Sequence, residues 1–514
     1  MKGKFYESEY EKALIDLLQA EGWQYTNGGN IHRQLREPLL IEDPKVNDLR
    51  VYLQNQYPDL ADSDVTEVIN YLRHVPGQSH FERLRNTFQL VRDGYRYTRH
   101  GDGVNFDIRF IDFDNTDCNI FRAVNQFEVA YGMKNDVRIP DVLLFVNGIP
   151  LCIFELKNPT KLDADIAQAY EQIHTRYMRD IPHLLRYCPL SCISDATDNN
   201  TRLGTTYTPY EHYYAWKKVN NEDPSAQKGI DQVRTIVKGV HEPSRFLEIL
   251  RDYVYFPDEK SGREEEIVCR YPQFFATRMM SDSIRRAFKE QTSKGGTYFG
   301  ATGCGKTYTM MFIARQLALR CKELGSPTVI MIVDRDDLQT QAGKLFLRSQ
   351  DFLQLGTVKV ISDREELKTE LSLRDSGGFF ICTIQKFCES IGELNTRRNI
   401  ICFSDEAHRT QIRLSSKIKV VEHKDIEAKV EQTSAGAVAV RIIDESKIGA
   451  FVTKPYAEQL RTAFPNATFV GFTGTPIAET IQVFGEIVDR YTMQQAVDDE
   501  ITKDIKYIPR TLPK

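Results

Sequence analysis

A glycine-rich stretch in the middle of the chain carries a phosphate-binding pattern. Gly300–Thr307 satisfies G-x-x-x-x-G-K-[ST] without a mismatch, with an apolar run before it and a helical pattern after it. Glycines let successive backbone N–H groups curl around a polyphosphate, the lysine reaches the outer phosphates, and the threonine hydroxyl binds Mg²⁺. The pattern therefore predicts a nucleoside triphosphate site. The expected contacts are Gly300, Thr302, Gly303, Cys304, Gly305, Lys306 and Thr307.

Two adjacent carboxylates complete this site in the sequence. Asp405 and Glu406 directly follow the apolar run Ile400–Ser404, about 100 residues after the glycine-rich stretch. The phosphate loop supplies one metal ligand, Thr307, and no general base. A carboxylate at a neighbouring strand end can hold Mg²⁺, and the next one can orient the attacking water. We assign the first role to Asp405 and the second to Glu406.

A second set of charged residues lies upstream, in two apolar runs on either side of an Asn-Gly pair at positions 147–148. Asn-Gly between apolar runs is a strong hairpin signal. Asp141 lies on the first strand, whereas Glu155 and Lys157 lie on the second, two residues apart and so on one face. Two carboxylates for Mg²⁺, the Leu156 carbonyl and a lysine beside the attacking water suit metal-dependent phosphodiester cleavage. The alternative is an ordinary acid–base pair on a surface hairpin.

The turn decides whether Asp141 shares a face with Glu155. A two-residue turn with flat register would pair Val146 with Ile149 and turn Asp141 away from the other carboxylate. A three-residue loop, with its glycine in the left-handed bulge position, pairs Phe145 with Ile149 and sets Asp141 diagonally beside Glu155. We therefore predict a three-residue, bulged hairpin loop.

The patterns around these residues predict two α/β domains, because 514 residues are too many for one core. Residues 1–260 combine amphipathic helices with apolar strands, including an alternating region from Thr87 to Phe127, and predict a mixed sheet. Residues 261–514 repeat strand–helix units typical of a doubly wound parallel sheet. We place the boundary near residue 260, in the charged and solvated connection Asp258–Glu266. A polar, β-prone insertion at residues 414–450 is expected to form a surface hairpin.

Composition adds weaker constraints. The net charge of −5 gives no general sign of nucleic-acid binding, so any DNA path must be a local basic surface. The sequence shows neither a membrane-spanning apolar run nor a signal pattern. The ten cysteines are scattered, and the close pair Cys188 and Cys192 has no second pair to complete a zinc site. Reduced thiols in the cytoplasm are the natural expectation.

These motifs resemble those of superfamily-two helicases and translocases. Gly300–Thr307 is similar to motif I, the Asp-Glu-Ala-His run Asp405–His408 to motif II, and Thr473–Thr475 to motif III. Gln273 resembles the glutamine that reads adenine in ATP. Arg335 and Gln341 resemble a segment that touches the nucleic-acid backbone.

Together with the upstream hairpin, nearly the whole chain resembles the N-terminal part of the restriction (motor and nuclease) subunit of type I restriction–modification enzymes. The segments that carry this resemblance are Asn125–Phe127, Arg138–Asp141, Val146–Leu151, Phe154–Pro159, Thr383–Phe387 and Gly471–Pro476.

The resemblance implies a PD-(D/E)xK endonuclease domain over residues 1–260 and one RecA-like ATPase domain over residues 261–514. It implies ATP-driven translocation of double-stranded DNA and Mg²⁺-dependent cutting of unmethylated DNA far from the recognition site. The expected partners are methyltransferase and specificity subunits, in the bacterial or archaeal cytoplasm. Since the chain stops soon after motif III, we expect the second motor domain to be missing and ATP to be bound weakly.

The resemblance also assigns supporting residues. The family carries a Q-x-x-x-Y element on the helix after the nuclease strands. The nearest match here, Gln172–Tyr177, has one extra residue, so Gln172 and Tyr177 should lie less neatly on one α-helical face. Glu11, on the first helix, resembles a further acidic residue of such nucleases, although a solvated helix face is its alternative explanation.

Three other functions remain open. A type III restriction subunit or a repair nuclease would also join a motor to a nuclease, but in type III subunits the nuclease tends to follow the motor. A nucleic-acid sensor or remodeller could keep a nuclease-like domain only for binding. The intact set of Asp141, Glu155 and Lys157 argues against that last function, because binding alone does not require all three.

Overall fold

The computed structural model describes most of the chain in two compact units. The first unit contains Met1–Arg278, Gly303–Arg315 and Met493–Lys514, and the second contains Met279–Thr302 and Gln316–Thr492. The described residues are 7–134, 136–157, 166–195, 197, 199–225, 229–257, 264–334, 336–383, 392–407, 417–419, 428–432, 438–442, 451–453 and 456–502.

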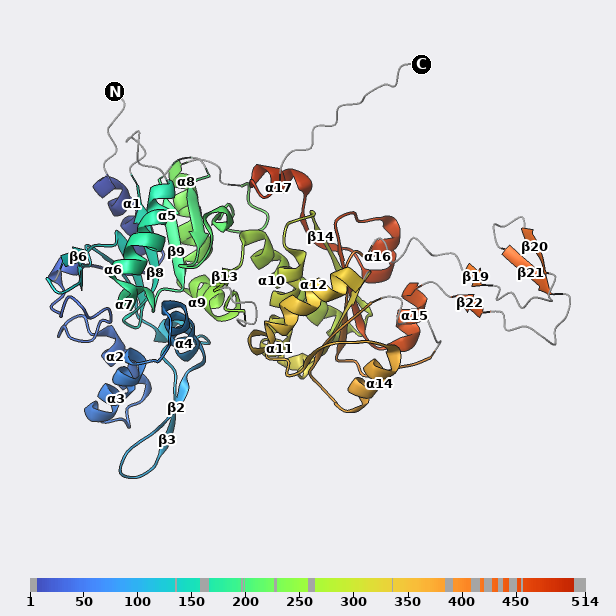
Figure 1. Cartoon of the computed structure of the whole chain (residues 1–514), viewed down its shortest axis with the longest axis horizontal. Helices are drawn as coiled ribbons and strands as arrows, with labels where there is room; N and C mark the ends of the chain where they lie inside the picture. The colour runs from blue at the N-terminus through green and yellow to red at the C-terminus, as the bar shows by residue number, and fades with distance from the viewer. Residues whose placement is uncertain are drawn as a thin grey trace, which may run out of the picture. The chain divides into compact units, whose positions relative to one another are not determined.

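A seven-stranded mixed sheet forms the centre of the first unit (Figure 1). The pairs β1–β4 and β8–β9 are parallel, and the other neighbouring pairs are antiparallel. The predicted mixed sheet is therefore confirmed. The strand order is β1 (Gln24–Asn27), β4 (Phe121–Asn125), β7 (Val142–Val146), β8 (Ile149–Leu156), β9 (Leu190–Ser194), β10 (Thr201–Gly204) and β11 (Tyr214–Ala215).

Helices cover one face of this sheet near its middle. α5 (Ile166–Glu171) continues into the π-helix η3 (Gln172–Tyr177), and both pack against Ile153 of β8 and Ile193 of β9. β7 and β8 are buried along their whole lengths. This explains why both strands read as continuous apolar runs rather than as alternating ones.

The opposite face of the sheet is covered by α1 (Glu7–Ala20) and α8 (Gly229–Val240), which contact each other. Tyr10 of α1 forms a hydrogen bond of 2.5 Å with Ser194. Successive strand residues point to opposite faces, so Ser194 faces away from the side that Ile193 occupies. A charged side chain on β8 is therefore enclosed by packed helices whichever face it takes.

Part of the alternating region predicted as strands is helical. α4 (His80–Asp93) begins at Ser79, whose side chain caps the helix by accepting the Glu82 N–H. The apolar residues that α4 buries, Phe81, Leu84, Phe88 and Val91, recur at the three- and four-residue spacing of a helix. The prediction of strands from Thr87 onwards is therefore wrong for this part. The rest of the region does contain strands, β2 (Tyr95–Thr98), β3 (Asn105–Ile108) and β4.

A seven-stranded sheet of wholly parallel pairs forms the centre of the second unit. The predicted α/β fold with a parallel sheet in the second half is confirmed. The strand order is β16 (Val358–Val360), β17 (Phe379–Thr383), β15 (Thr328–Val333), β18 (Ile400–Ser404), β23 (Thr468–Thr473), β14 (Lys294–Gly300) and β24 (Ile487–Tyr491).

Helices lie on both faces of the parallel sheet, as a doubly wound fold requires. One face packs against α14 (Arg364–Ser372), α15 (Tyr456–Ala463) and α16 (Ala478–Phe484). α12 (Asp336–Leu347) packs on the other face, where the rings of Phe346 and Phe379 stack with centroids 4.3 Å apart.

Short antiparallel strands occur in the predicted insertion. β20 (Ala428–Gln432) pairs with β21 (Val438–Ile442), and β19 (Lys417–Lys419) pairs with β22 (Phe451–Thr453). The hairpin pairing agrees with the prediction, whereas the side chains of residues 414–450 lie outside the described residues. Among the helices that the structure describes, none has the length and apolar character needed to span a membrane.

Candidate nuclease and nucleotide sites

The turn between β7 and β8 has two residues, so the predicted three-residue loop is wrong. Val146 pairs with Ile149, and the intervening residues have φ angles of 50° at Asn147 and 75° at Gly148. Two left-handed residues form the tight turn that matches strand twist. A Cβ on Gly148 would lie 2.7 Å from the Leu49 backbone nitrogen, so neighbouring backbone packs directly against this turn.

A β-bulge further along the hairpin nevertheless shifts the pairing of β7 with β8 by one residue. Phe145 pairs with Pro150 but Leu144 pairs with Cys152, so Leu151 is an extra residue on β8. Beyond this β-bulge Val142 pairs with Phe154, and the next position along sets Asp141 beside Glu155. The predicted shared face is thus right, but the bulge lies inside β8 and not in the loop.

The two carboxylates differ in their surroundings. Asp141 is partly buried, and its Oδ2 accepts the Leu156 backbone N–H at 2.6 Å. Glu155 is fully buried. Burial, and next the negative charge of Asp141, raise the pKa of Glu155 to about 8. A buried carboxyl beside a second carboxylate favours either a proton or a cation.

Lys157 supplies a positive charge beside Glu155. Its Nζ lies 2.5 Å from Glu155 Oε1 and donates to the Leu156 carbonyl at 3.1 Å. One ammonium group therefore bridges two of the oxygen atoms that the sequence assigned to a metal ion. The structure brings Asp141, Glu155, Leu156 and Lys157 together, as predicted.

Gln172 and Tyr177 join the same cluster. Gln172 Nε2 donates to the Tyr177 hydroxyl at 2.7 Å, and that hydroxyl is placed to donate to Glu155 Oε2 at 3.1 Å. The expectation that their five-residue spacing would set them less neatly on one helical face is wrong, because residues 172–177 form a π-helix. A π-helical turn bonds residue i to residue i+5, which sets these two side chains on one face.

Glu11 accepts hydrogen bonds from residues at the end of β4. Among the described residues its hydrogen bonds come from the side-chain amides of Asn125 and Gln126. Asn125 pairs with Val142, which adjoins Asp141, so Glu11 lies near the same end of the sheet. The hydrogen bonds to these amides argue against a purely solvated role for Glu11.

The phosphate loop has the predicted context of strand, loop and helix. β14 ends at Gly300, and α11 (Lys306–Leu319) begins at Lys306. Gly303 and Gly305 have φ angles of 83° and 86°, which side chains rarely adopt. Gly305 also contacts Gln273, because a Cβ there would lie 2.5 Å from Gln273 Nε2.

Gln273 connects the start of a long helix to this loop. It lies near the start of α10 (Tyr271–Glu290), where its Oε1 accepts the Arg270 backbone N–H at 2.9 Å. Its Nε2 donates to the Gly305 carbonyl at 3.4 Å. The predicted adenine-reading residue is therefore adjacent to the phosphate loop.

Asp405 and Glu406 follow the end of β18, two strands away from β14 in the parallel sheet. Glu406 has φ 48°, an uncommon backbone conformation for a residue with a side chain, and its N–H donates to Asp405 Oδ1 at 3.0 Å. Strained residues of this kind concentrate at functional sites. Gly300, Thr302, Asp405 and Glu406 belong to the second unit, whereas Gly303–Thr307 belongs to the first.

Two residues of the predicted motor motifs, His408 and Arg335, lie outside the described residues. Gln341 is exposed on α12. In the β23 motif, the Thr475 N–H donates to Thr473 Oγ1 at 3.1 Å.

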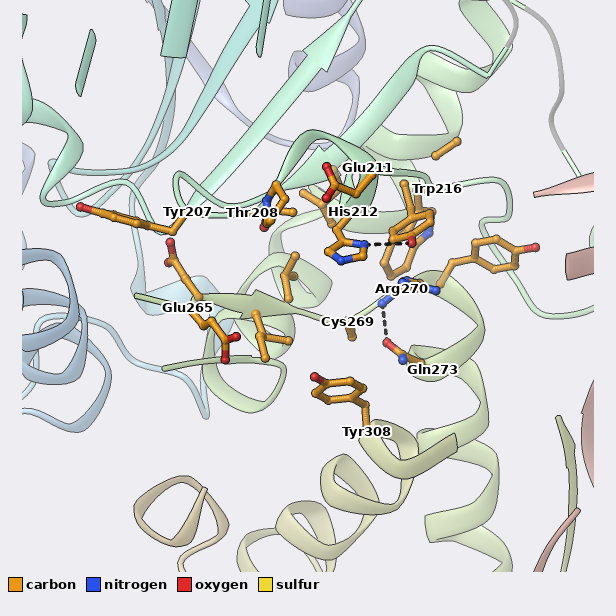
Figure 2. Close-up of a pocket in the computed structure, with 18 of the residues that line it drawn as sticks. Tyr207, Thr208, Glu211, His212, Trp216, Glu265, Cys269, Arg270, Gln273 and Tyr308 are labelled. Carbon is orange, nitrogen blue, oxygen red and sulfur yellow. Dashed lines mark hydrogen bonds between the residues drawn. The ribbon is translucent and has the colours of Figure 1, made fainter. Parts of the chain in front are cut away.

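A cavity of about 580 Å³ adjoins Gln273 in the first unit (Figure 2). Its wall includes Tyr214, Trp216 and Tyr308, and the Arg270 guanidinium carbon lies 3.5 Å from the centroid of the Tyr214 ring. Sequence reasoning found Gln273 but missed the aromatic residues, because Tyr214 and Trp216 lie far from the loop in sequence. Glu266, expected on a solvated connection, is instead buried at this cavity, and burial raises its pKa well above the ordinary value.

Two family matches cover separate parts of the chain, the first containing the nuclease cluster and the second the phosphate loop and the carboxylates after β18. Residues 4–212 match the family of the type I restriction enzyme R protein N terminus, and residues 272–514 match the SWI2/SNF2 ATPase family. The chain is therefore similar to an R-protein N-terminal domain over its first part and to a SWI2/SNF2 ATPase over its second.

Relatives of this kind are endonuclease subunits. The chain is 33% identical to the type I restriction enzyme HindI endonuclease subunit of Haemophilus influenzae, over 98% of this chain and 46% of that protein. It is 26% identical to the putative type I restriction enzyme MjaIXP endonuclease subunit of Methanocaldococcus jannaschii, over 97% of this chain and 46% of that protein. The chain spans about half the length of these relatives. The predicted relationship to type I restriction subunits is confirmed.

A solved structure of the ATP-dependent Type ISP restriction-modification enzyme LlaBIII bound to DNA is also similar. It matches with 15% identity and a TM-score of 0.29, over 49% of this chain and 17% of that one. This score is too low to support a structural argument.

Proposed function

We propose that the chain is the nuclease and first motor part of a type I restriction subunit, which uses ATP to translocate double-stranded DNA and cuts unmethylated DNA far from its recognition site. The observation that carries this proposal is the register of the β7–β8 hairpin, which gathers Asp141, Glu155 and Lys157 in a chain that also contains a phosphate loop. The methyltransferase and specificity subunits would be its partners, since the relatives are subunits by name.

The nuclease cluster fits a divalent cation. Two carboxylates are neighbours here, and the fully buried one, Glu155, is paired with the Lys157 ammonium group. A buried negative charge without full compensation is costly, and Mg²⁺ would balance it with the hard oxygen ligands that it prefers. Asp141, Glu155 and the Leu156 carbonyl would hold the ion, which would supply an activated water. Lys157 would orient that water, while Tyr177 would hold Glu155 in place and Gln172 would hold Tyr177.

The nucleotide site would use the phosphate loop and the two carboxylates that follow β18. Gly300 and Thr302–Thr307 would bind the phosphates, Thr307 and Asp405 would hold Mg²⁺, and Glu406 would orient the water that attacks the terminal phosphate. Gln273 would read the adenine, and the aromatic cavity beside it suits a flat heterocyclic base. We place the boundary between nuclease and motor domains near residue 260, in the stretch between the two family matches.

Two lysine substitutions test this function in the full-length subunit assembled with its partners. Lys157→Ala should abolish DNA cleavage and leave DNA-stimulated ATPase activity intact. Lys306→Ala should abolish both activities, because translocation precedes cutting. Lys45→Ala, at an exposed lysine of the first unit, should change neither activity. Cleavage that survives Lys157→Ala would overturn the nuclease assignment and favour a domain that only binds DNA.

A further inference from the structure

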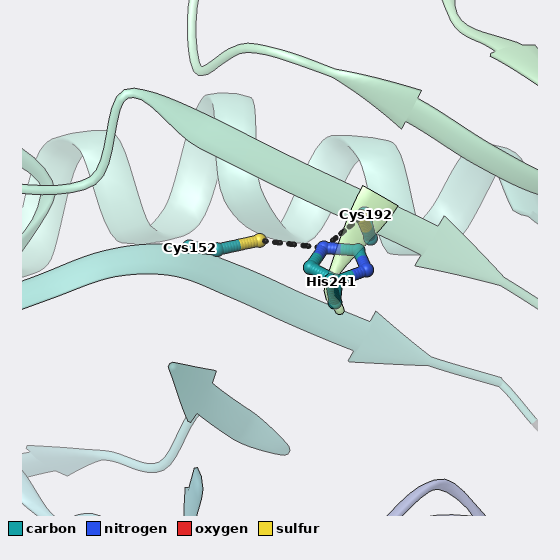
Figure 3. Close-up of side chains that lie close together, drawn as sticks. All are labelled: Cys152, Cys192 and His241. Atoms are coloured by element: carbon teal, nitrogen blue, oxygen red, sulfur yellow. Dashed lines mark hydrogen bonds between the residues drawn. The ribbon is translucent and has the colours of Figure 1, made fainter. Parts of the chain in front are cut away.

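Two thiol sulfurs and one imidazole nitrogen meet on the face of the first sheet opposite the nuclease cluster (Figure 3). Cys152 comes from β8, Cys192 from β9, and His241 from the position after α8. All three side chains are fully buried. Among the described residues this is the one group of three His, Cys, Asp or Glu side chains close enough to share a metal ion.

The two sulfur–nitrogen distances match those of a tetrahedral zinc site. Each thiol sulfur lies 3.7 Å from His241 Nε2. Zn–S bonds of about 2.3 Å and Zn–N bonds of about 2.0–2.1 Å, at tetrahedral angles, separate sulfur from nitrogen by about 3.6 Å. An ion would therefore fit between these atoms without a large movement of the strands.

The imidazole is oriented as metal-binding histidines are. Its Nδ1 lies 3.2 Å from the Ile236 carbonyl, which favours the tautomer that carries its proton on Nδ1. That tautomer leaves the Nε2 lone pair directed at both sulfurs. The backbone of His241 is held as well, because its carbonyl accepts the Trp23 indole N–H at 2.6 Å.

Charge balance favours a divalent ion. Phe154 and Phe246 flank the imidazole, with ring centroids 4.9 and 5.6 Å from its own. An apolar environment of this kind penalises net charge. Two thiolates and one neutral imidazole cancel a charge of +2, whereas a monovalent ion would leave a buried negative charge.

We propose that Cys152, Cys192 and His241 form a structural site for a thiophilic divalent cation, zinc above all, within the nuclease domain. The protein would supply three ligands, and a water molecule would complete the coordination. Sequence spacing could not reveal this site, because its ligands come from positions 152, 192 and 241 and not from paired Cys-x-x-Cys motifs.

Such an ion would brace the sheet behind the nuclease cluster. Cys152 and Glu155 are three residues apart on β8 and face opposite sides of the sheet. Fixing Cys152 to β9 and to the end of α8 would restrain β8 next to its bulge. The site is independent of the proposed function, since its occupancy concerns folding and not cleavage.

Metal binding must also release protons. Burial, followed by the neighbouring Cys192, raises the pKa of the Cys152 thiol well above its ordinary value. Zn²⁺ would replace the protons of both thiols: two R–SH and Zn²⁺ give Zn(SR)₂ and two H⁺.

Metal analysis of the full-length chain, purified without chelators or metal-affinity resin, tests the site directly. We expect one zinc per chain by inductively coupled plasma mass spectrometry. Cys152→Ser, Cys192→Ser and His241→Gln should each lower that content by more than half. Cys188→Ser is the matched control: Cys188 is equally buried, but its sulfur faces the Pro150 carbonyl at 3.3 Å and lies outside the cluster.

A second measurement does not depend on the folding of variants. The wild-type chain, expressed with Co²⁺ in place of Zn²⁺, should show the near-ultraviolet absorption of a cobalt–thiolate bond, and added Zn²⁺ should remove it. Purified chain without bound metal and without the cobalt–thiolate band would overturn the proposal. The cluster would then be two thiols hydrogen-bonded to a core imidazole.

Discussion

The two sheets of this protein place functional residues by different means. In the parallel sheet, Gly300 and Asp405 lie at or just beyond the carboxyl ends of strands whose interiors are apolar. In the mixed sheet, Glu155 lies within β8 itself, where one residue of register decides which face it takes. A site at strand ends tolerates small shifts in pairing, whereas a site within a hairpin depends on a particular bulge.

The register that the bulge at Leu151 sets provides the most severe test of this difference. Deletion of Leu143, which pairs with Ile153, should abolish DNA cleavage. With the bulge kept, the deletion would set Asp141 opposite Phe154, turned away from Glu155, and would move buried apolar side chains to the wrong faces. The measurement is cleavage by the assembled complex, with the thermal stability of the isolated subunit alongside.

Leu143→Met is the control for this deletion, since it keeps the chain length and nearly the volume of a side chain that is fully buried. It should retain cleavage within a few-fold. Full cleavage by the deletion variant would show that Asp141 does not need its present register.

Nucleotide binding by the phosphate loop should depend on the absence of a side chain at Gly305 and not on the pairing register of a strand. Gly305→Ala should lower nucleotide affinity at least about 100-fold, because the loop has φ 86° there and a Cβ would meet Gln273 Nε2 at 2.5 Å. Gly325→Ala provides a matched control with φ 59° and open space around the added Cβ. Binding of a fluorescent ATP analogue would measure both variants, and equal affinities would contradict the role of Gly305.

The buried carboxyl of the nuclease cluster predicts an unusual dependence of stability on pH. The pKa of Glu155 is raised from its ordinary 4.5 to about 8, so the folded state keeps a proton that the unfolded state has lost. Stability from this group is fully present below pH 4.5 and is lost as pH rises towards 8. Its slope between these limits is about 1.4 kcal/mol per pH unit.

Urea denaturation without divalent cations, from pH 5.5 to 8, measures this slope. Glu155→Gln should flatten it in this range, and Mg²⁺ should stabilise the wild type more at pH 8 than at pH 5.5, because the cation replaces the proton. A slope that is the same in wild type and Glu155→Gln would contradict the predicted coupling.

The sequence predicted contiguous motifs better than it predicted sites assembled from distant residues. The phosphate loop, the carboxylates after β18 and the parallel sheet could be predicted, because each motif is local and its strand context is apolar. The hairpin was predicted, but its bulge was expected in the loop and lies within β8. The pairing register depends on packing around Gly148 and Pro150, which the local sequence does not show. The helix α4 was mistaken in part for strands, because residues 87–127 contain both kinds of apolar spacing. The cavity wall at Tyr214 and the Cys152 cluster join distant parts of the chain, and no local pattern marks them.

The smallest expected effect concerns the π-helix that supports the nuclease cluster. A π-helical turn is an α-helix with one inserted residue, so removal of that residue can leave both flanks in register. Deletion of Thr175, an exposed residue, would turn Gln172–Tyr177 into the four-residue spacing of the Q-x-x-x-Y element. The amide and the phenol would still meet on one face of a regular helix. Cleavage should therefore stay within a few-fold of the wild type, with Thr175→Ala as the control of unchanged length.

Tyr177→Phe, which removes the hydroxyl from Glu155 Oε2, should lower cleavage about ten-fold with ATPase activity unchanged. If the deletion of Thr175 instead lost as much activity as Tyr177→Phe, the extra residue would be needed to aim the tyrosine at Glu155, and the π-helix would itself be part of the nuclease site.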